Sequence, residues 1–244
     1  LLAILYKWVK RAKFVYHIQD LQIDAAKELK MINSQMLFRM MFRVEKYILC
    51  KADYISSISD GMINKIKMKC GRPVVFFPNW VDTQVFYPLQ NKNQLKHQFG
   101  FSPDEKIVLY SGAIGNKQGL EAILFAARDI NRPNVKFVIC GSGPYKEILN
   151  NMRMDMKLEN VIFLPLQPKE KLNEFLNMAD VHMVLQKANA NDLVMPSKLT
   201  NIFSVGGLAL VAASKESSLH SIVSRHNMGI LLEPENTPAL TEAI

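Results

Sequence analysis

The segment MPSKLTNIFSVGG, residues 195–207, carries the most specific arrangement of polar residues in the chain. Pro196 suits the first turn of a helix, so Ser197 and Lys198 are expected at the amino end of that helix, just beyond a strand. Helix amino ends present unpaired N–H groups, and together with a lysine they suit an anion such as a diphosphate. The rest of the segment is apolar up to its closing glycine pair. A polar start on an otherwise apolar helix favours binding over packing alone.

A second candidate is the turn in YSGAIGNKQGLEAI, residues 110–123, which combines glycines with a lysine. Gly112 and Gly115 precede a helix that is expected to begin near Gly119, and Lys117 lies in the same loop. Glycine lets a backbone approach a phosphate closely, and the helix end adds unpaired N–H groups. The pattern fits a phosphate site, and it fits a plain strand-to-helix turn with one exposed lysine as well.

Two weaker candidates complete the set of residues that suggest chemistry. The turn CGSGPYKE, residues 140–147, places Gly141 and Gly143 ahead of a helix opened by Pro144. Such glycines more often serve turn geometry than ligand contact. His17 follows an apolar segment, FVYHI, and a single histidine in that position is more often structural than functional.

The elements that must position these residues are short apolar segments alternating with helical stretches of about ten residues. This alternation predicts a doubly wound α/β domain, in which ligands bind beyond the carboxyl ends of the parallel strands. We expect a partial domain at 1–80, a linker at 81–90 and a second, nucleotide-binding domain at 91–244. The chain opens within a pattern and closes inside a helix, so we expect a fragment truncated at both ends. The expected strands of the second domain are 106–112, 135–141, 160–165, 181–186, 208–213 and 229–233.

The charge of the chain is concentrated at one end. The net charge is +8, and residues 1–80 carry 14 Lys and Arg against 6 Asp and Glu, so the remainder is neutral overall. Such a block suits an anionic membrane surface or a lipid pyrophosphate, and a solvated helix face without a partner explains it equally. We expect no nucleic-acid partner, because the basic residues are not interleaved with stacking aromatics.

Cysteine spacing and hydropathy set further bounds. The three cysteines have no CxxC spacing, which suggests neither a disulfide framework nor a zinc site and fits a reducing cytoplasm. No apolar run is long enough to predict a membrane-spanning helix.

Several of these strings resemble those of one enzyme family. MPSKLTNIFSVGG resembles the PSKLxExxAxGxPVV motif of family 4 glycosyltransferases, and SGAIGNKQGLE resembles their glycine loop. PNWVDTQVFYP is similar to their interdomain linker. With HIQD and ISSIS, the set most resembles the colanic-acid-type exopolysaccharide transferases, a subgroup described as fucosyltransferases. The resemblance covers essentially the whole chain and implies the GT-B architecture, two Rossmann-like domains, with the N-terminal one incomplete here.

Carried over by position, the resemblance implies roles for individual residues. Lys117 and Lys198 would hold the donor pyrophosphate, and His17 would face the donor sugar; these three form the expected catalytic set. Asp20 and Asp24 would meet the sugar or the acceptor. The expected substrate-binding set is Asp20, Gly112, Gly115, Gly141, Gly143, Leu166, Pro196, Ser197, Leu199 and Asn201.

Three positions depart from the family pattern, and one nearby residue has a simpler explanation. Asn201 stands where a glutamate usually binds the ribose, and it lacks the charge while keeping hydrogen-bonding capacity. Ala113 stands where many members have arginine, and Gln118 where a lysine is usual. Glu45, on a long expected helix, is interpreted as an ion-pairing surface residue.

The implied activity is sugar transfer with retention, from a nucleotide-diphosphate sugar to a lipid-linked oligosaccharide or polysaccharide precursor in exopolysaccharide, capsule or lipopolysaccharide synthesis. GDP-fucose is the expected donor and a UDP-sugar the alternative. The resemblance also implies catalysis without a bound metal, and the lack of a DxD carboxylate pair agrees with that, so we expect no metal and no cofactor. The expected location is cytoplasmic, peripheral at the inner face of the cell membrane.

Two other functions stay open. One is a sugar-nucleotide epimerase or phosphorylase of the same architecture, although the carboxylate and histidine sets of those enzymes are not seen. The other is a non-catalytic nucleotide-binding remnant, which the departures at Ala113 and Asn201 keep open.

Overall fold

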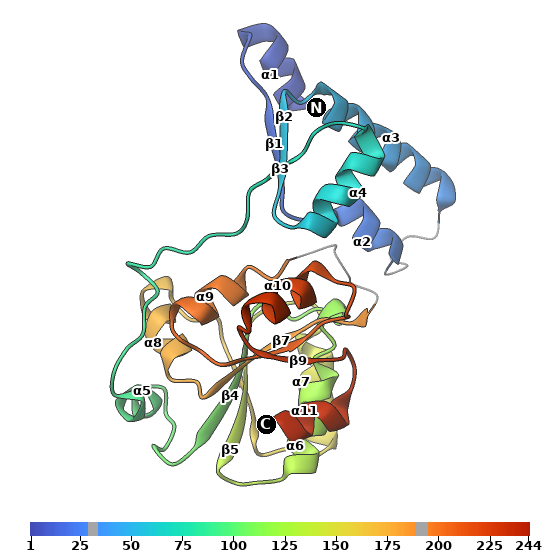
Figure 1. Ribbon diagram of the computed structural model, residues 1–244. Helices are drawn as coiled ribbons and strands as arrows, with labels where there is room; N and C mark the ends of the chain where they lie inside the picture. Colours follow the sequence, from blue (N-terminus) through green and yellow to red (C-terminus); the bar gives the residue numbers. More distant parts are fainter. Residues whose placement is uncertain (29–33, 189–194) are drawn as a thin grey trace. The chain divides into compact units, whose positions relative to one another are not determined.

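The computed structural model describes residues 1–28, 34–188 and 195–244 (Figure 1). The chain forms two compact units. The first consists mainly of Leu1–Asn79. The second is made of Trp80–Ala188, Pro196–Glu216 and His220–Ile244.

The first unit is built on a three-stranded parallel sheet in the order β1-β2-β3. The strands are β1 (Val15–Ile18), β2 (Tyr54–Ser57) and β3 (Val75–Phe76). The helices are α1 (Leu2–Lys10), α2 (Gln22–Glu28), α3 (Gln35–Lys51) and α4 (Asp60–Cys70). The apolar core of this unit lies between the strands and the helices that follow them, and its largest buried residues include Leu21, Leu49, Ile55, Met62 and Ile66.

Serine caps fix where the two longer helices of this unit begin. The Ser34 hydroxyl accepts a hydrogen bond from the Leu37 N–H at the start of α3. The Ser59 hydroxyl accepts one from the Met62 N–H at the start of α4. A side-chain oxygen at this position satisfies one of the four unpaired N–H groups of a helix end.

The second unit contains a six-stranded parallel sheet in the order β6-β5-β4-β7-β8-β9. Each strand lies within its predicted range, so the doubly wound prediction is confirmed. The order reverses between β4 and β7, and at such a point the loops diverge and leave an opening at the carboxyl edge. The strands are β4 (Lys106–Ser111), β5 (Val135–Cys140), β6 (Val161–Leu164), β7 (Val181–Leu185), β8 (Ala209–Ala212) and β9 (Ile230–Leu232).

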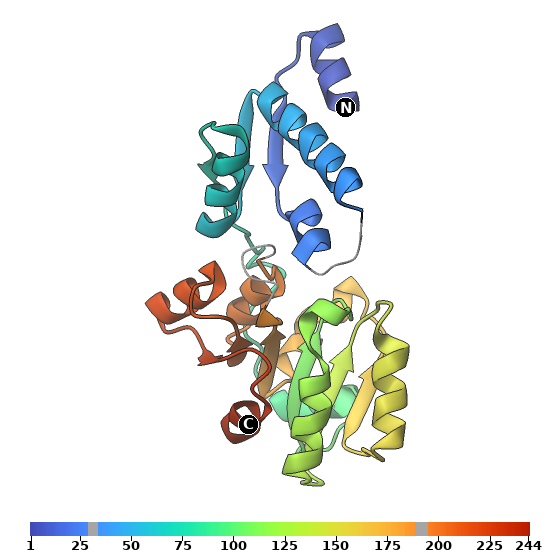
Figure 2. The same ribbon diagram turned by 90° about the vertical axis from the view of Figure 1, so that its right-hand side faces the viewer.

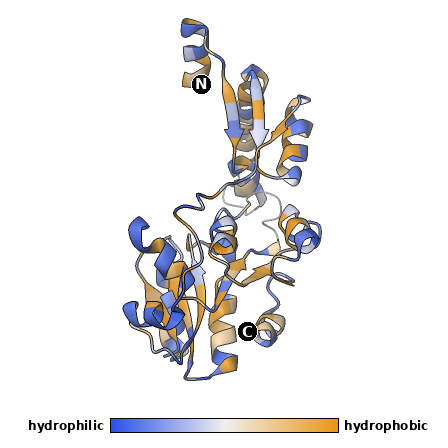
Figure 3. Cartoon of the chain, turned by 60° about the vertical axis from the view of Figure 1, so that its left-hand side comes forward, coloured by the Kyte–Doolittle hydropathy of each residue, from blue (hydrophilic) through white to orange (hydrophobic). Residues whose placement is uncertain are grey.

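Helices cover both faces of this sheet (Figure 2). One face packs against α6 (Glu121–Ile130), α7 (Lys146–Asp155) and α11 (Thr237–Ala243), which contribute Leu124, Leu149 and Leu240 to the core. The opposite face packs against α5 (Lys92–Gln98) and α8 (Leu172–Asn177), which contribute Leu95 and Phe175. The strands of this sheet are coloured mainly as hydrophobic in Figure 3, as expected for a sheet covered on both faces. The remaining elements are η1 (Asn116–Gln118), η2 (Lys169–Lys171), α9 (Lys198–Ser204) and α10 (Ser218–His226).

The helix α5 was not predicted from the sequence. Its seven residues, KNQLKHQ, are mostly polar, so no apolar periodicity marks it. Leu95 and Lys96 are nevertheless buried, because tertiary contacts supply what the local pattern lacks.

The amino edge of the six-stranded sheet holds a buried lysine with a carboxylate partner. The Lys96 side chain is 2% exposed, and its Nζ donates to Asp180 Oδ2 at 2.8 Å and to the Glu105 carbonyl at 2.6 Å. The Ile107 N–H, at the start of β4, donates to the same carboxylate at 2.8 Å. Burial alone would raise the pKa of Asp180, but the hydrogen bonds from Lys96 and Ile107 outweigh it and lower that pKa.

Candidate functional site

The loops that follow β4 and β5 are joined by their backbones at the carboxyl edge of the sheet. The Gly112 N–H donates to the Cys140 carbonyl at 3.0 Å, and the Ile114 N–H donates to the Ser142 carbonyl at 2.9 Å. Each loop therefore fixes the position of the other, and the edge presents a rigid surface of main-chain groups.

Two of the predicted phosphate-site glycines are explained by this contact between loops. A Cβ atom on Gly141 would lie 1.9 Å from the Gly112 carbonyl oxygen, and one on Gly143 would lie 2.1 Å from the Ile114 carbonyl oxygen. No side chain fits at either position. Gly141 and Gly143 thus have a packing role in the structure, whatever they contribute to a ligand.

The side chain of Lys198, the first residue of α9, turns inward against the end of β4. Its Nζ lies 3.6 Å from the centroid of the Tyr110 ring and donates to the Met183 carbonyl at 3.3 Å. The same nitrogen would lie 3.7 Å from a Cβ atom on Gly112. The lysine that the sequence singled out therefore reaches the glycine loop that it singled out independently.

The ammonium group of Lys198 has an unusual electrostatic setting. Among the described residues it makes no ion pair with a carboxylate. Burial lowers the pKa of Lys198 to about 7, because the charged form has lost water without gaining a counter-ion. An anionic ligand would supply that missing charge, and perturbed pKa values of this kind gather at functional sites.

A cavity of about 190 Å³ lies beside this lysine. It is bounded by β4, α8, β7 and α9, which all belong to the second unit. Its polar lining is Ser111, His182, Ser197, Lys198 and Asn201, and the main apolar lining is Leu109, Leu172, Leu176 and Ile202. Asn201, the residue that departs from the family glutamate, therefore does face the same space as Lys198.

His182, which the sequence reasoning missed, also lines this cavity. Its side chain is buried, and within the described part of the chain its Nε2 has no hydrogen-bond partner. Burial, and next the positive charges of Lys92 and Lys198, lower the pKa of His182 to about 4, so the ring is neutral at pH 7. Gly207 packs so closely that its Cβ would lie 2.7 Å from Nε2. Nothing in the apolar strand VHMVL distinguishes a cavity-facing histidine from a core one.

The other residues of the MPSKL segment are placed around the start of α9. Ser197 is the exposed N-cap residue, and the Leu199 N–H donates to the Pro196 carbonyl at 3.1 Å. The Leu199 side chain is buried, and Leu199 does not line the cavity. The part of the motif before Met195, residues 192–194, lies outside the described residues.

Lys117 lies in η1, in a loop that is tied to the end of β7. The Gly115 N–H donates to Gln118 Oε1 at 3.1 Å, which closes the turn. The Lys117 carbonyl accepts a hydrogen bond from the Lys187 N–H at 3.0 Å, and Lys187 Nζ donates to Asn116 Oδ1 at 2.6 Å. Lys187, which the sequence reasoning did not single out, thus adds a second cation to this loop.

Helix α6 begins slightly later than expected, and Glu121 lies in its first turn. Gly119 ends η1, so the helix that was predicted to begin near it begins at Glu121. Glu121 Oε1 accepts from the Tyr145 hydroxyl at 2.6 Å and lies 3.7 Å from Lys187 Nζ. A carboxylate here offsets the positive helix end. The positive charge of the loop after β4 therefore comes mainly from the side chains of Lys117 and Lys187 and less from the amino end of α6.

Leu166, expected near the nucleoside, follows β6 and is 61% exposed. It does not line the cavity that contains Lys198.

The remaining predicted residues belong to the first unit. His17 lies on β1, where its Nδ1 is 3.0 Å from the Ser56 hydroxyl and its ring meets Phe77 edge to face at 5.4 Å. Asp20 is exposed just after the strand. These contacts hold the His17 ring in one orientation.

Asp24 and Glu45 share a single lysine. Lys69 Nζ lies 2.7 Å from Glu45 Oε2 and also pairs with Asp24 Oδ2. The ion-pairing role predicted for Glu45 is confirmed, but its side chain is only 14% exposed, so it is not the surface residue that was expected. Asp24 is engaged in the same pair.

Two absences hold for residues 1–28, 34–188 and 195–244. No helix there combines the length and apolar composition needed to cross a bilayer. His, Cys, Asp and Glu side chains there form no group of three or more that could hold a metal ion.

The parallel sheet, with a glycine loop and a lysine at the carboxyl ends of its strands, is typical of nucleotide-binding α/β domains. Comparison with known proteins gives the family. Residues 91–244 match the family described as glycosyl transferases group 1. The chain is also 36% identical, over 96% of its length, to a protein of Escherichia coli (strain K12) named as a colanic acid biosynthesis glycosyl transferase, WcaI. The chain belongs to the group 1 glycosyl transferase family, and it spans 59% of the length of WcaI.

Solved structures support the fold. HepE from Anabaena, solved with UDP and glucose, matches 98% of this chain and 63% of its own with a TM-score of 0.79 at 16% identity. Sucrose-phosphate synthase from Thermosynechococcus elongatus matches 98% and 60% with a TM-score of 0.75 at 20% identity. The α/β architecture with parallel sheets is thus that of the GT-B glycosyltransferases.

Proposed function

We propose that this chain is the donor-binding part of a retaining glycosyltransferase that builds an exopolysaccharide. The donor would be a nucleotide-diphosphate sugar and the acceptor a lipid-linked oligosaccharide or polysaccharide precursor. Family membership supports the class of reaction, and the name of WcaI supports the polysaccharide setting.

The observation that carries the proposal is the ammonium group of Lys198, which makes no ion pair with a carboxylate of residues 1–28, 34–188 or 195–244. It lies against the glycine loop at the carboxyl edge of a parallel sheet, beside a cavity of about 190 Å³. Lys198 is half-buried, and a cation that has lost water without a counter-ion in the described part of the chain is costly. A diphosphate supplies two or more negative oxygens at this position. Binding of the donor would therefore stabilise the charged form of Lys198.

The same contact gives the lysine a catalytic role. Cleavage of the bond between the sugar and the diphosphate leaves negative charge on the departing phosphate oxygens. Lys198 would stabilise that charge, with Lys117 and Lys187 supplying further positive charge from the η1 loop. The acceptor hydroxyl would attack on the face from which the diphosphate leaves and give its proton to a phosphate oxygen. No metal is required in this scheme, and His17 of the first unit would face the donor sugar.

GDP-fucose is the donor we favour, with a UDP-sugar as the alternative. The subgroup resemblance supports the first, and the presence of UDP and glucose in the structure of HepE supports the second. Asn201 lies in the cavity lining, where its amide can bind a ribose hydroxyl without the charge of a glutamate.

A thermal-shift panel of GDP, UDP, ADP and dTDP, with and without magnesium, tests the proposal. A ligand at about 100 times its dissociation constant stabilises by roughly 2.7 kcal/mol, which for a chain of this size means a shift of several degrees. We expect one base to give a magnesium-independent shift. No shift with any of the four would reject the donor site, and a shift without sugar transfer would favour the non-catalytic remnant.

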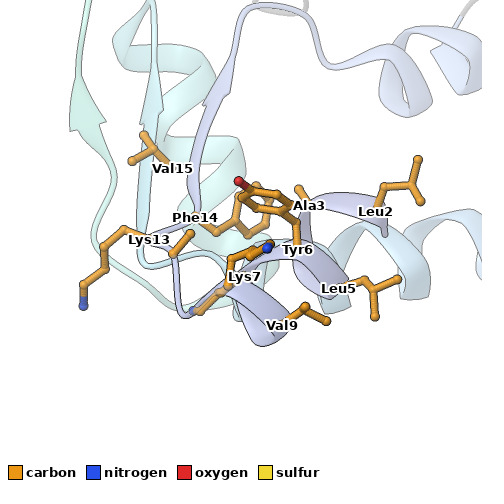
Figure 4. Close-up of a pocket in the computed structure, with 11 residues that line it drawn as sticks. Leu2, Ala3, Leu5, Tyr6, Lys7, Val9, Lys13, Phe14 and Val15 are labelled. Carbon is orange, nitrogen blue, oxygen red and sulfur yellow. The ribbon is translucent and has the colours of Figure 1, made fainter.

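We also propose that the protein binds peripherally to the cytoplasmic face of the cell membrane through its first unit. No residue of α1 is buried, and Leu2 and Trp8 are 84% and 80% exposed. Figure 4 shows Leu2, Leu5 and Val9 of this helix with Lys7 and Lys13 around a pocket of about 830 Å³. Exposed leucine and tryptophan with nearby Lys10 and Arg11 are typical of helices that lie in a membrane interface.

Liposome flotation tests this docking. We expect binding to vesicles containing anionic lipid, weaker binding in high salt, and loss of binding when Trp8 and Leu5 are both replaced by serine. Binding that is independent of salt and of anionic lipid would contradict an electrostatic dock.

A further inference from the structure

Tyr110, the penultimate residue of β4, makes two polar contacts at the candidate site although it is 1% exposed. Its ring lies under the ammonium group of Lys198, with 3.6 Å from Nζ to the ring centroid. Its hydroxyl donates to the Ala113 carbonyl at 2.6 Å, in the loop that begins at Gly112. One side chain thus contacts both the lysine and the glycine loop.

The three groups meet around a single point. A Cβ atom on Gly112 would lie 3.7 Å from Lys198 Nζ and 3.7 Å from Tyr110 Oη. The preceding residues of β4 are Val108 and Leu109, which pack through apolar contacts alone. Packing would be satisfied by an apolar side chain at Tyr110 as well, so the aromatic ring and the hydroxyl need another reason.

Burial raises the pKa of Tyr110, so the hydroxyl stays protonated and remains a donor. It cannot act as a base or as a counter-ion for Lys198. The ring offers the ammonium group a cation–π contact, which is strongest where both partners are shielded from water.

We propose that Tyr110 is a positioning residue that sets the distance between the Lys198 ammonium group and the glycine loop, so that both meet the same diphosphate. This inference rests on the proposed function. The ring supports the ammonium group from one side, and the hydroxyl fixes the loop on the other. Removing the ring would let the lysine side chain take other rotamers, and removing only the hydroxyl would loosen only the loop.

The test compares the affinity of a nucleoside with that of its diphosphate in the full 244-residue chain. The probes are guanosine with GDP and uridine with UDP, measured by calorimetry or ligand-observed NMR. The variants are Tyr110→Leu, Tyr110→Phe, Lys198→Met and the double variant Tyr110→Leu with Lys198→Met. The measured quantity is the dissociation constant of the nucleoside divided by that of its diphosphate. This ratio isolates the phosphate-dependent part of binding, and it falls when affinity for the diphosphate alone is lost.

We expect Tyr110→Leu to lower this ratio about tenfold or more, as the loss of a shielded cation–π contact predicts, and to leave nucleoside affinity unchanged. Tyr110→Phe keeps the ring and should lower the ratio only about threefold, the effect of one lost hydrogen bond. In the Lys198→Met background, Tyr110→Leu should lower the ratio only about threefold, because the contact through the lysine is already lost and only the hydroxyl contact with the loop remains to be removed.

Parallel losses of nucleoside and diphosphate affinity would mean a structural role and would overturn the inference. The inference is also overturned if Tyr110→Leu lowers the ratio equally in the unmodified chain and in the Lys198→Met variant. If the Tyr110→Leu variant does not fold, the test rests on the ratio measured for Tyr110→Phe. An unchanged ratio for that variant overturns the role of the Tyr110 hydroxyl in positioning the loop. Failure of the unmodified chain to bind any nucleoside diphosphate would instead reject the proposed function, and this inference with it.

Discussion

A lysine packs at each end of the parallel strands of the six-stranded sheet, Lys96 at the amino ends and Lys198 at the carboxyl ends. Only Lys96 has a counter-ion among the described residues. At the amino edge, Lys96 is buried against Asp180, and the pair is completed by backbone groups at the start of β4. At the carboxyl edge, Lys198 meets an aromatic ring and a carbonyl, with its pKa lowered to about 7. Within the described residues, the same sheet therefore places one cation beside a carboxylate and another beside an aromatic ring and a carbonyl.

This difference between Lys96 and Lys198 predicts that one lysine contributes mainly to folding stability and the other mainly to ligand binding. A buried ion pair is satisfied within the protein, and removing one partner leaves an uncompensated charge. The half-buried Lys198, which has no carboxylate partner in the part of the chain that the structure describes, already carries part of that cost, and an anionic ligand can relieve it. We therefore expect substitutions at the amino edge to change folding and substitutions at the carboxyl edge to change affinity.

The largest effect is expected at the amino edge. Lys96→Met should lower the free energy of unfolding by about 3 kcal/mol, because Asp180 would lose its buried partner and keep only the more exposed Lys92. Chemical denaturation measures this change. The affinity for a nucleoside diphosphate, measured well below the melting temperature, should stay within about twofold of the unmodified chain. A large loss of affinity with unchanged stability would contradict the comparison.

Lys198→Met should show the reverse pattern. Affinity for the nucleoside diphosphate should fall about 100-fold, the effect of one charge-assisted contact, while the melting temperature at pH 7 stays equal or rises. The unfolded lysine, with its ordinary pKa of 10.5, binds its proton more tightly than the folded one. The burden on folding is thus full below pH 7 and disappears as pH rises toward 10.5. A lower melting temperature at pH 7 would argue for a packing role.

The pH dependence of affinity sharpens the comparison further. Above pH 7 the free site increasingly holds a neutral Lys198, whose pKa is about 7, so binding must take up a proton. Affinity should fall about fivefold between pH 7 and pH 8, as the titration of one such group predicts. Isothermal titration calorimetry in buffers of different ionisation enthalpy should detect the proton uptake. Lys198→Arg, which stays charged, should remove most of this dependence.

The smallest effect tests the amino edge again. Lys92 Nζ lies 3.7 Å from Asp180 Oδ1, but the lysine side chain is 45% exposed. Lys92→Ala should lower the free energy of unfolding by only about 0.5 kcal/mol, the usual contribution of an exposed ion pair, and less in high salt. A loss comparable to that of Lys96→Met would mean that the carboxylate depends on both lysines equally.

The sequence predicted the order and type of nearly every strand, because each is a short apolar segment bounded by polar turns. It missed α5, whose polar sequence becomes helical only through the burial of Leu95 and Lys96. It also placed the start of α6 near Gly119, whereas a 3₁₀ turn intervenes before Glu121. Short elements stabilised mainly by tertiary contacts leave little local signal.

The candidate site was predicted in part. Lys198, Gly112 and Asn201 were named from the MPSKL and glycine-loop motifs, and all three line one cavity. His182 and Tyr110 were not, because a histidine or tyrosine inside an apolar strand looks like a core residue in one dimension. Only the packing of neighbouring strands shows which side of the sheet each one faces.

The sequence by itself determined the alternation of strands and helices, the glycine turns and the presence of a lysine at the start of α9. These are properties of neighbouring residues, set by backbone geometry and local apolar patterning. The tertiary structure decided which charges are neutralised, since that depends on residues far apart in the chain. Asp180 meets Lys96 across 84 positions, and Tyr110 meets Lys198 across 88. Distance in space, which sets both desolvation and pairing, is the quantity that a single sequence does not contain.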